Sequence, residues 1–198
     1  GLTTISSGVL AANSASALGS TAGGTTVVAG AGLQLNGASI GAEPLTLNGS
    51  GVGGVGALSS TGSSSFGGAI TLASNTTIGS TGSLALNGTV DGGFDLAINS
   101  TSAVTIGGNV GVGAALTSLA TDTGGSTVIG SGVVIRTSGT QVYLDAVTAP
   151  SVTLTSTGSS ITAVNAANDF GTLSLNGSNA TIRDGSGITL GTSALNVG

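Results

Sequence analysis

The sequence predicts an all-β protein, a β-solenoid of about ten coils. Three observations lead to this fold class: the composition, a two-residue apolar alternation, and a short repeated unit. Of the 198 residues 38 are Gly, 39% are hydrophobic and only 5% are charged, and Cys, Met, Trp and His are absent. Disordered chains combine low hydrophobicity with high net charge, so this composition indicates an apolar β core with many turns.

Apolar residues alternate with polar ones over runs of about four residues and do not follow the spacing of a helix face. Each run predicts a short strand with two inward residues and one outward residue. The predicted strands are, in order, Leu33–Leu35, Leu45–Leu47, Ile70–Leu72, Leu84–Leu86, Leu96–Ile98, Val104–Ile106, Val133–Ile135, Val142–Leu144, Val152–Leu154, Leu173–Leu175, Ala180–Ile182 and Ile188–Leu190.

Residues that tolerate positive φ separate these runs, and they predict sharp turns. An Asn-Gly pair usually marks a two-residue hairpin. Here the unit Leu-x-Leu-Asn-Gly recurs from positions 33, 45, 84 and 173, and repetition of one unit favours a solenoid over a β-sandwich. The turn pairs are Asn36-Gly37, Asn48-Gly49, Asn87-Gly88, Gly107-Gly108 and Asn176-Gly177.

We expect residues 1–198 to form a single β-solenoid segment, with a change of repeat style near residues 111–123. In that stretch Ala114, Leu116 and Leu119 suit either a short helix or an irregular coil. At about twenty residues per coil the chain makes about ten coils. The side chains expected in the core are Leu33, Leu47, Leu86, Ile106, Val152, Leu175 and Ile188.

Two stretches resemble known families of bacterial surface proteins. Residues 23–107 resemble the autotransporter-associated β-strand repeats, through Val27–Gly37, Glu43–Gly51, Gly68–Leu72 and Thr77–Ser80. Residues 142–191 are similar to the repeats of filamentous-haemagglutinin-like adhesins, through Val152–Thr155, Ser160–Ala163, Asn165–Gly171 and Ile188–Gly191. Both resemblances imply a right-handed parallel β-helix that Gram-negative bacteria secrete and display or release outside the cell.

Charge narrows the set of partners. The net charge is −5, and Arg136 and Arg183 are the only basic side chains, so we expect no nucleic-acid partner. Apolar runs such as Gly132–Ile135 are far too short to span a bilayer, so we expect no membrane insertion. A Ser/Thr-rich β chain without Cys or Lys is typical of exported bacterial material, which predicts an extracellular or cell-surface location.

Several motifs have a catalytic or binding interpretation beside an ordinary structural one. Gly51–Gly56 fits the dinucleotide pattern G-x-G-x-x-G, but the next acid is Asp91 and a strand and turn follow, which indicates a glycine-rich corner. Asp91 and Asp95 could approach each other across a turn and act in sugar hydrolysis or bind calcium. We interpret them as solvated turn residues.

Two Arg–Asp combinations suggest a carbohydrate-cleaving groove, Arg136 near Asp145 and Arg183-Asp184, and we interpret both as surface ion pairs. Nucleophilic catalysis lacks its usual His base. Threonine pairs at 121/123, 153/155 and 155/157 follow no fixed period, so they indicate ordinary strand surface rather than an ice-binding plane.

The sequence therefore predicts a noncatalytic extracellular β-solenoid, structural or adhesive, that serves as fibre, stalk or sheath material. The alternative is a carbohydrate-active enzyme, or a glycan- or ice-binding module, on a β-helix. We predict no catalytic, cofactor-binding or metal-ligating residue and no cofactor. Residues 1–8 and 187–198 contain no charge, proline or helical pattern, so we expect uncapped ends that associate head to tail or continue in a longer chain. Surface glycans are the other expected partner.

Overall fold

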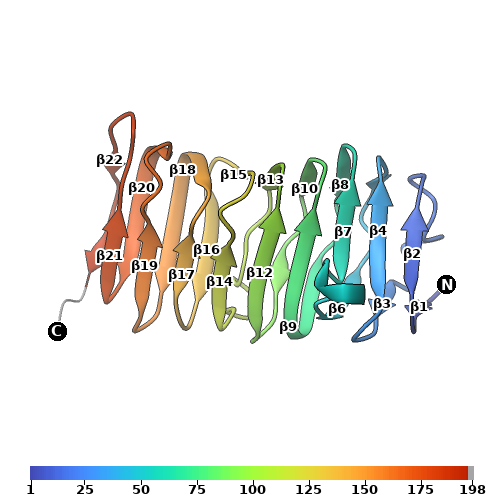
Figure 1. Ribbon diagram of the computed structural model, residues 1–198. Helices are drawn as coiled ribbons and strands as arrows, with labels where there is room; N and C mark the ends of the chain where they lie inside the picture. The colour runs from blue at the N-terminus through green and yellow to red at the C-terminus, as the bar shows by residue number, and fades with distance from the viewer. Residues whose placement is uncertain (196–198) are drawn as a thin grey trace.

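The computed structural model describes residues 1–195, so the last three residues of the expected solenoid segment and of its C-terminal end lie outside the described part. The chain forms stacked parallel coils, a β-solenoid of about 10 turns, as the sequence predicts. The coils lie in one row, with the first and last described coils at opposite ends (Figure 1). The right-handed sense of coiling stays a prediction from the family resemblance, and it is the sense that parallel crossovers strongly prefer.

The coils contribute strands to two sheets, and every strand pairing is parallel. The 13-stranded sheet contains β1 (Thr3–Ile5), β2 (Val9–Ala12), β3 (Thr25–Val27), β4 (Gly32–Asn36), β6 (Leu45–Gly49), β7 (Leu58–Thr61), β9 (Ile70–Ser80), β11 (Val90–Asp91), β12 (Asp95–Ser100), β14 (Ser118–Thr121), β17 (Gln141–Tyr143), β19 (Ser160–Ala163) and β21 (Asn179–Ile182). The 10-stranded sheet contains β5 (Ser39–Ile40), β8 (Ser64–Phe66), β10 (Leu84–Leu86), β13 (Ala103–Ile106), β15 (Ser126–Ile129), β16 (Val133–Thr137), β18 (Ala146–Ser156), β20 (Asp169–Gly177), β22 (Thr189–Leu190) and β23 (Ala194–Leu195).

The core consists of columns, in which inward side chains lie one above another in successive coils. One column runs through Phe66, Leu86, Ile106 and Ile129, each paired with the next by strand register. All four are fully or almost fully buried. Burial of one large aliphatic side chain contributes about 1.5–3 kcal/mol, so the columns hold the coils together.

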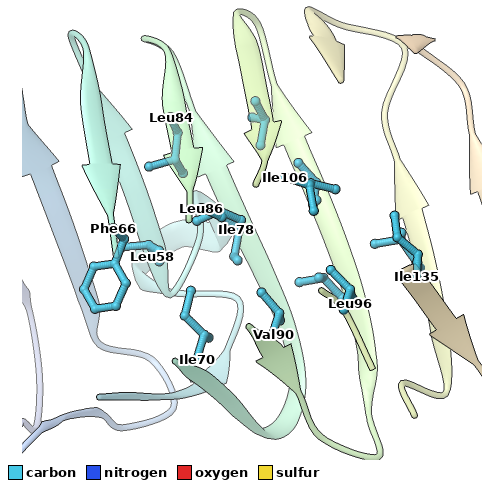
Figure 2. Packing of buried hydrophobic residues seen from close by; sticks show 14 of the residues in the cluster. Leu58, Phe66, Ile70, Ile78, Leu84, Leu86, Val90, Leu96, Ile106 and Ile135 are labelled. Atoms are coloured by element: carbon cyan, nitrogen blue, oxygen red, sulfur yellow. The ribbon is translucent and has the colours of Figure 1, made fainter. Parts of the chain in front are cut away.

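Two more columns run through the interior. The first runs through Leu45, Ile70, Val90 and Val110, and the second through Leu33, Leu58, Ile78 and Ile98. Members of all three columns point into the space between the coil walls in Figure 2. Six of the seven side chains predicted to be in the core are buried, and Ile188 is half-buried because it lies in the last described coil.

Glycine is required where the backbones of neighbouring coils touch. Gly68, Gly88 and Gly108 lie one above another in successive coils. A Cβ on Gly88 would collide with the carbonyl oxygen of Gly68, and a Cβ on Gly108 would collide with that of Gly88. The positive-φ turn predicted at Asn-Gly and Gly-Gly pairs is confirmed at Gly37 (φ 65°) and Gly49 (φ 77°). It is wrong at Gly88, Gly107, Gly108 and Gly177, where φ is not positive. At Gly88 and Gly108 close backbone approach is the constraint instead.

Strand and coil lengths differ from the expected uniform unit. β9 and β18 each span 11 residues, because a strand can continue into the next side of the coil without a turn. Coil length also varies, since residue 90 pairs with residue 110 but residue 45 pairs with residue 70. Residues 111–123 contain no helix; they form an irregular loop followed by β14, and β14 joins β12 to β17 without a break in the sheet.

The predicted orientation of Val142 and Leu144 is wrong. Gln141 and Tyr143 of β17 point inward and are fully buried, whereas Leu144 is 43% exposed. The Tyr143 hydroxyl donates to Gln141 Oε1 at 3.1 Å, and the Gln141 amide donates to the carbonyl oxygen of Thr155 at 2.8 Å. The inward orientation is favourable because these polar groups find partners inside the solenoid.

The glycine contacts yield a testable prediction. We expect Gly88→Ala to lower the free energy of unfolding by about 1–3 kcal/mol, because the new methyl group must displace the backbone of the neighbouring coil. Gly93→Ala is the matched control, since a Cβ at Gly93 meets no atom within 4 Å. Urea denaturation followed by circular dichroism measures both, and equal effects of the two substitutions would contradict this account.

Candidate functional site

The carboxylates of Asp91 and Asp95 each accept hydrogen bonds from the following coil. Asp91 Oδ1 accepts the backbone N–H groups of Gly113 at 2.8 Å and Ala114 at 3.1 Å. Asp95 Oδ1 accepts the hydroxyl of Ser118 at 2.7 Å. No group of three or more metal-ligating side chains occurs among residues 1–195. These carboxylates therefore fasten the loop at Gly113 and Ala114, and the start of strand β14, to the preceding coil.

Asp145 is buried, so the predicted surface ion pair with Arg136 is wrong. Its side chain is only 3% exposed, and Arg136 lies on the outside of β16. The carboxylate accepts the hydroxyl of Thr121 on Oδ1 at 2.6 Å and the hydroxyl of Thr127 on Oδ2 at 2.7 Å. Two threonines thus replace the cation that the sequence suggested.

Burial governs the protonation of this carboxyl group. Desolvation raises the pKa of Asp145, the hydrogen bonds from Thr121 and Thr127 lower it in part, and the nearby charge of Asp122 raises it further. Burial and the charge of Asp145 also raise the pKa of Tyr143. Asp145 is therefore a core group whose ionisation opposes folding.

A second buried carboxylate repeats the same arrangement near the N-terminus. Glu43 is 2% exposed, and its Oε1 accepts the hydroxyl of Thr25 at 2.9 Å. The separation is 18 residues, the same as between Thr127 and Asp145. Glu43 Oε2 has no hydrogen-bond partner within the described residues, so this acid is held by one threonine where Asp145 is held by two.

In the Arg183-Asp184 pair, Asp184 also accepts hydrogen bonds from backbone N–H groups. Asp184 Oδ1 accepts the N–H of Phe170 at 2.7 Å, and Oδ2 accepts the N–H groups of Ser186 and Gly187. These bonds, chiefly the one from Phe170, lower the pKa of Asp184. Arg183 is exposed, and the predicted ion pair is replaced by these N–H contacts.

The glycine-rich motif forms a folded corner. Val52–Gly54 make a short 3-10 turn, η1, and Gly51 and Gly56 both have positive φ. A Cβ at Gly79 of β9 would collide with the carbonyl oxygen of Val55, so the loop lies flat against the strand. The structural interpretation of this motif is confirmed, because strand β7 follows where a dinucleotide site needs a helix N-terminus.

A row of threonines outside the three predicted pairs recurs in four successive coils of unequal length. Thr4, Thr26, Thr46 and Thr71 pair in register, and Thr71 pairs next with Asp91. Coils of 20 to 25 residues hide this row in the sequence. The row is one residue wide and ends at an acid, so it does not form the broad threonine plane that ice binding would require.

A groove crosses four coils beside Asp95. It has a volume of about 480 Å³ and is lined by Gly49, Ser50, Asn75, Thr76, Thr77, Asp95, Leu96, Ala97, Ser118 and Ala120. Its floor is the outward row Thr77, Ala97 and Ala120, paired in register on β9, β12 and β14. Of these lining residues only Asp95 stands out in the sequence, because Asn75 and Ser118 are ordinary polar residues until the coils stack.

Polar side chains form one rim of this groove. Asn75, Asp95 and Ser118 occupy equivalent positions in three successive coils. The N–H of Asp95 donates to Asn75 Oδ1 at 3.1 Å, and the Ser118 hydroxyl donates to Asp95 Oδ1 at 2.7 Å. The row is therefore linked along the solenoid axis and held in place. Two other hollows, of about 470 and 420 Å³, lie near the last and first described coils.

Comparison with known proteins finds no matching protein family, no matching curated protein and no matching solved structure. Among residues 1–195 there is no helix of the length and apolar character that a membrane crossing needs.

The buried acid leads to a prediction about pH. Because the folded state raises the pKa of Asp145, its contribution to stability is most favourable below the unfolded pKa of about 3.9 and declines as pH rises through the folded value. Wild type should therefore lose stability relative to Asp145→Asn as pH rises above the unfolded pKa of about 3.9. Urea unfolding at a series of pH values measures this difference.

Asp184→Asn provides a control of opposite sign. The folded state lowers the pKa of Asp184, so its stabilising contribution is present above the unfolded pKa and is lost as pH falls. Wild type should gain stability over Asp184→Asn as pH rises. Parallel pH profiles for the two variants would show that burial of Asp145 has no energetic consequence.

Proposed function

We propose that this chain is a noncatalytic structural or adhesive segment, a β-solenoid rod that acts outside the cell or at the bacterial cell surface. Its role is mechanical: it supplies length and a rigid, weakly charged surface. The observation that carries the proposal is the unbroken stacking of about 10 parallel coils around one apolar interior. Each coil of such a rod contacts only its neighbours, so the rod extends in one dimension, which suits a fibre, stalk or sheath.

Strand edges at both ends favour extension of the rod. Within the described residues β1 pairs only with β3, and β21 pairs only with β19. Apolar side chains are exposed at the same ends, with Leu2 72%, Leu190 63% and Leu195 44% accessible. An unpaired strand edge beside apolar surface is a template for another strand. A further parallel coil, from the same polypeptide or from another copy, can therefore continue the sheets.

The acidic side chains favour a noncatalytic role. Asp91, Asp95 and Asp184 each accept hydrogen bonds from a neighbouring coil or loop, and Asp145 is buried between two threonines. Each carboxylate thus has a structural use. The exposed arginines lie in different coils, so they do not combine with an acid pair into the cation-rich groove of a lyase.

Head-to-tail association can be tested at the N-terminal edge. The N–H of Thr3 and the carbonyl of Ile5 bond to the β3 side, at 3.0 Å each, so the N–H of the intervening Thr4 faces the free edge. Thr4→Pro should remove that donor without loss of the bonds to β3, and should reduce association of the purified chain. Light scattering at increasing protein concentration measures the effect.

Thr4→Val is the matched control, because it keeps the N–H and should associate like wild type. A folded wild-type chain that stays monomeric at every concentration would contradict self-association. Equal scattering by the proline and valine variants would show that this edge is not the contact.

The noncatalytic role predicts the outcome of activity assays. Incubation with soluble polysaccharides should release no new reducing ends and no unsaturated products. Asp91→Ala, Arg136→Ala and Arg183→Ala should stay folded, with losses of about 0 to 1 kcal/mol for the exposed arginines. Cleavage that disappears with any one of these substitutions would overturn the proposal.

A further inference from the structure

The groove beside Asp95 presents polar groups that the protein itself does not use. Asp95 Oδ1 and Asn75 Oδ1 accept hydrogen bonds along the rim, whereas Asp95 Oδ2 and Asn75 Nδ2 make none within the described residues. The hydroxyls of Thr77 and Ser50 also make no hydrogen bond within the described residues, and both residues line the groove. An acceptor and a donor on adjacent coils suit a ligand that carries many hydroxyl groups, since each hydroxyl both donates and accepts.

The spacing of the rim selects the shape of the ligand. Asn75, Asp95 and Ser118 recur once per coil, at the inter-strand distance of about 4.8 Å. An extended β-1,4-linked sugar chain advances by nearly the same distance per sugar, so it can place successive sugars on successive coils. We propose that this groove binds a neutral, extended β-1,4-linked polysaccharide that lies along the solenoid axis.

Charge and floor chemistry restrict the ligand class further. Asp95 is the one charged residue that lines the groove, so an acidic sugar would meet a like charge. The floor offers the methyl groups of Ala97 and Ala120, which can lie against the flat C–H face of a sugar ring. Ala97 is half-buried and Ala120 is exposed, so a chain can rest on both without displacing protein.

This binding site rests on the proposed function in its adhesive form, because it gives the rod a surface ligand. The direct test is isothermal titration calorimetry of the purified chain with cellohexaose. We expect saturable binding with a Kd on the order of 0.1–1 mM. Hexagalacturonate, which is acidic, and maltohexaose, whose α-linked chain curls, should bind at least about tenfold more weakly.

Two variants locate the site. Ala97→Leu fills the floor with an outward side chain, and Asp95→Ala removes the rim carboxylate; each should weaken cellohexaose binding by about tenfold or more. Ala85→Leu is the matched control, because Ala85 is also outward but lies on β10, between Ser65 and Thr105 in the other sheet. It should leave the Kd unchanged, and thermal melts should confirm that all variants fold.

Failure of this inference is distinguishable from failure of the proposed function. No binding of cellohexaose, equal binding by wild type and Ala97→Leu, or equal binding of maltohexaose or hexagalacturonate would each overturn the polysaccharide site. None of these results affects the association measured with Thr4→Pro. Release of cleaved sugar during the titration would instead overturn the noncatalytic role.

Discussion

The close approach of equivalent residues in adjacent coils is the constraint on which the rest of the structure depends. Parallel strands lie about 4.8 Å apart, so each side chain contacts its counterparts in the coils before and after it. Phe66, Leu86 and Ile106 can form a column because the equivalent position is apolar in each of their coils. Where the backbones themselves touch, as at Gly68 and Gly88, only glycine fits.

The same constraint decides how polar residues enter the interior. A lone buried carboxylate is unfavourable, but a coil one level away can supply donors at fixed spacing. Thr121 and Thr127 do so for Asp145, and Thr25 does so for Glu43. Hydrogen bonds between coils then add directional contacts to the apolar columns. Slippage of one coil relative to the next would break these contacts, so they specify register as well as stability.

The fold could be predicted from sequence because its main determinant is local. Alternating pairs such as Leu84 and Leu86 mark inward positions without knowledge of the partner coil, and such pairs recur along the chain. The prediction of side-chain orientation was wrong at β17, because the sequence pattern makes Val142 and Leu144 look like the inward pair. Gln141 and Tyr143 occupy those positions because partners as distant as Thr155 satisfy them, and that information is not local.

The groove was hidden from sequence reasoning for a related reason. Asn75, Asp95 and Ser118 are separated by 20 and 23 residues, and unequal coil lengths conceal their alignment. The threonine row from Thr4 to Thr71 was missed in the same way. Core positions can therefore be identified from short stretches of sequence. Surface rows cannot, because coil length varies and the rows appear only in the register of the folded chain.

A solenoid also changes what a shallow surface can achieve. Individually, an asparagine, an aspartate and a serine on a strand surface recognise little. When stacking places them in a row with one spacing, they present a repeated pattern to a ligand that is itself a repeat. The same regularity favours both the proposed mechanical role and the proposed polysaccharide site, because extension of the rod and recognition of a polymer both depend on a coil-by-coil period. Rigid spacing is thus the property that connects the apolar interior to the outer surface.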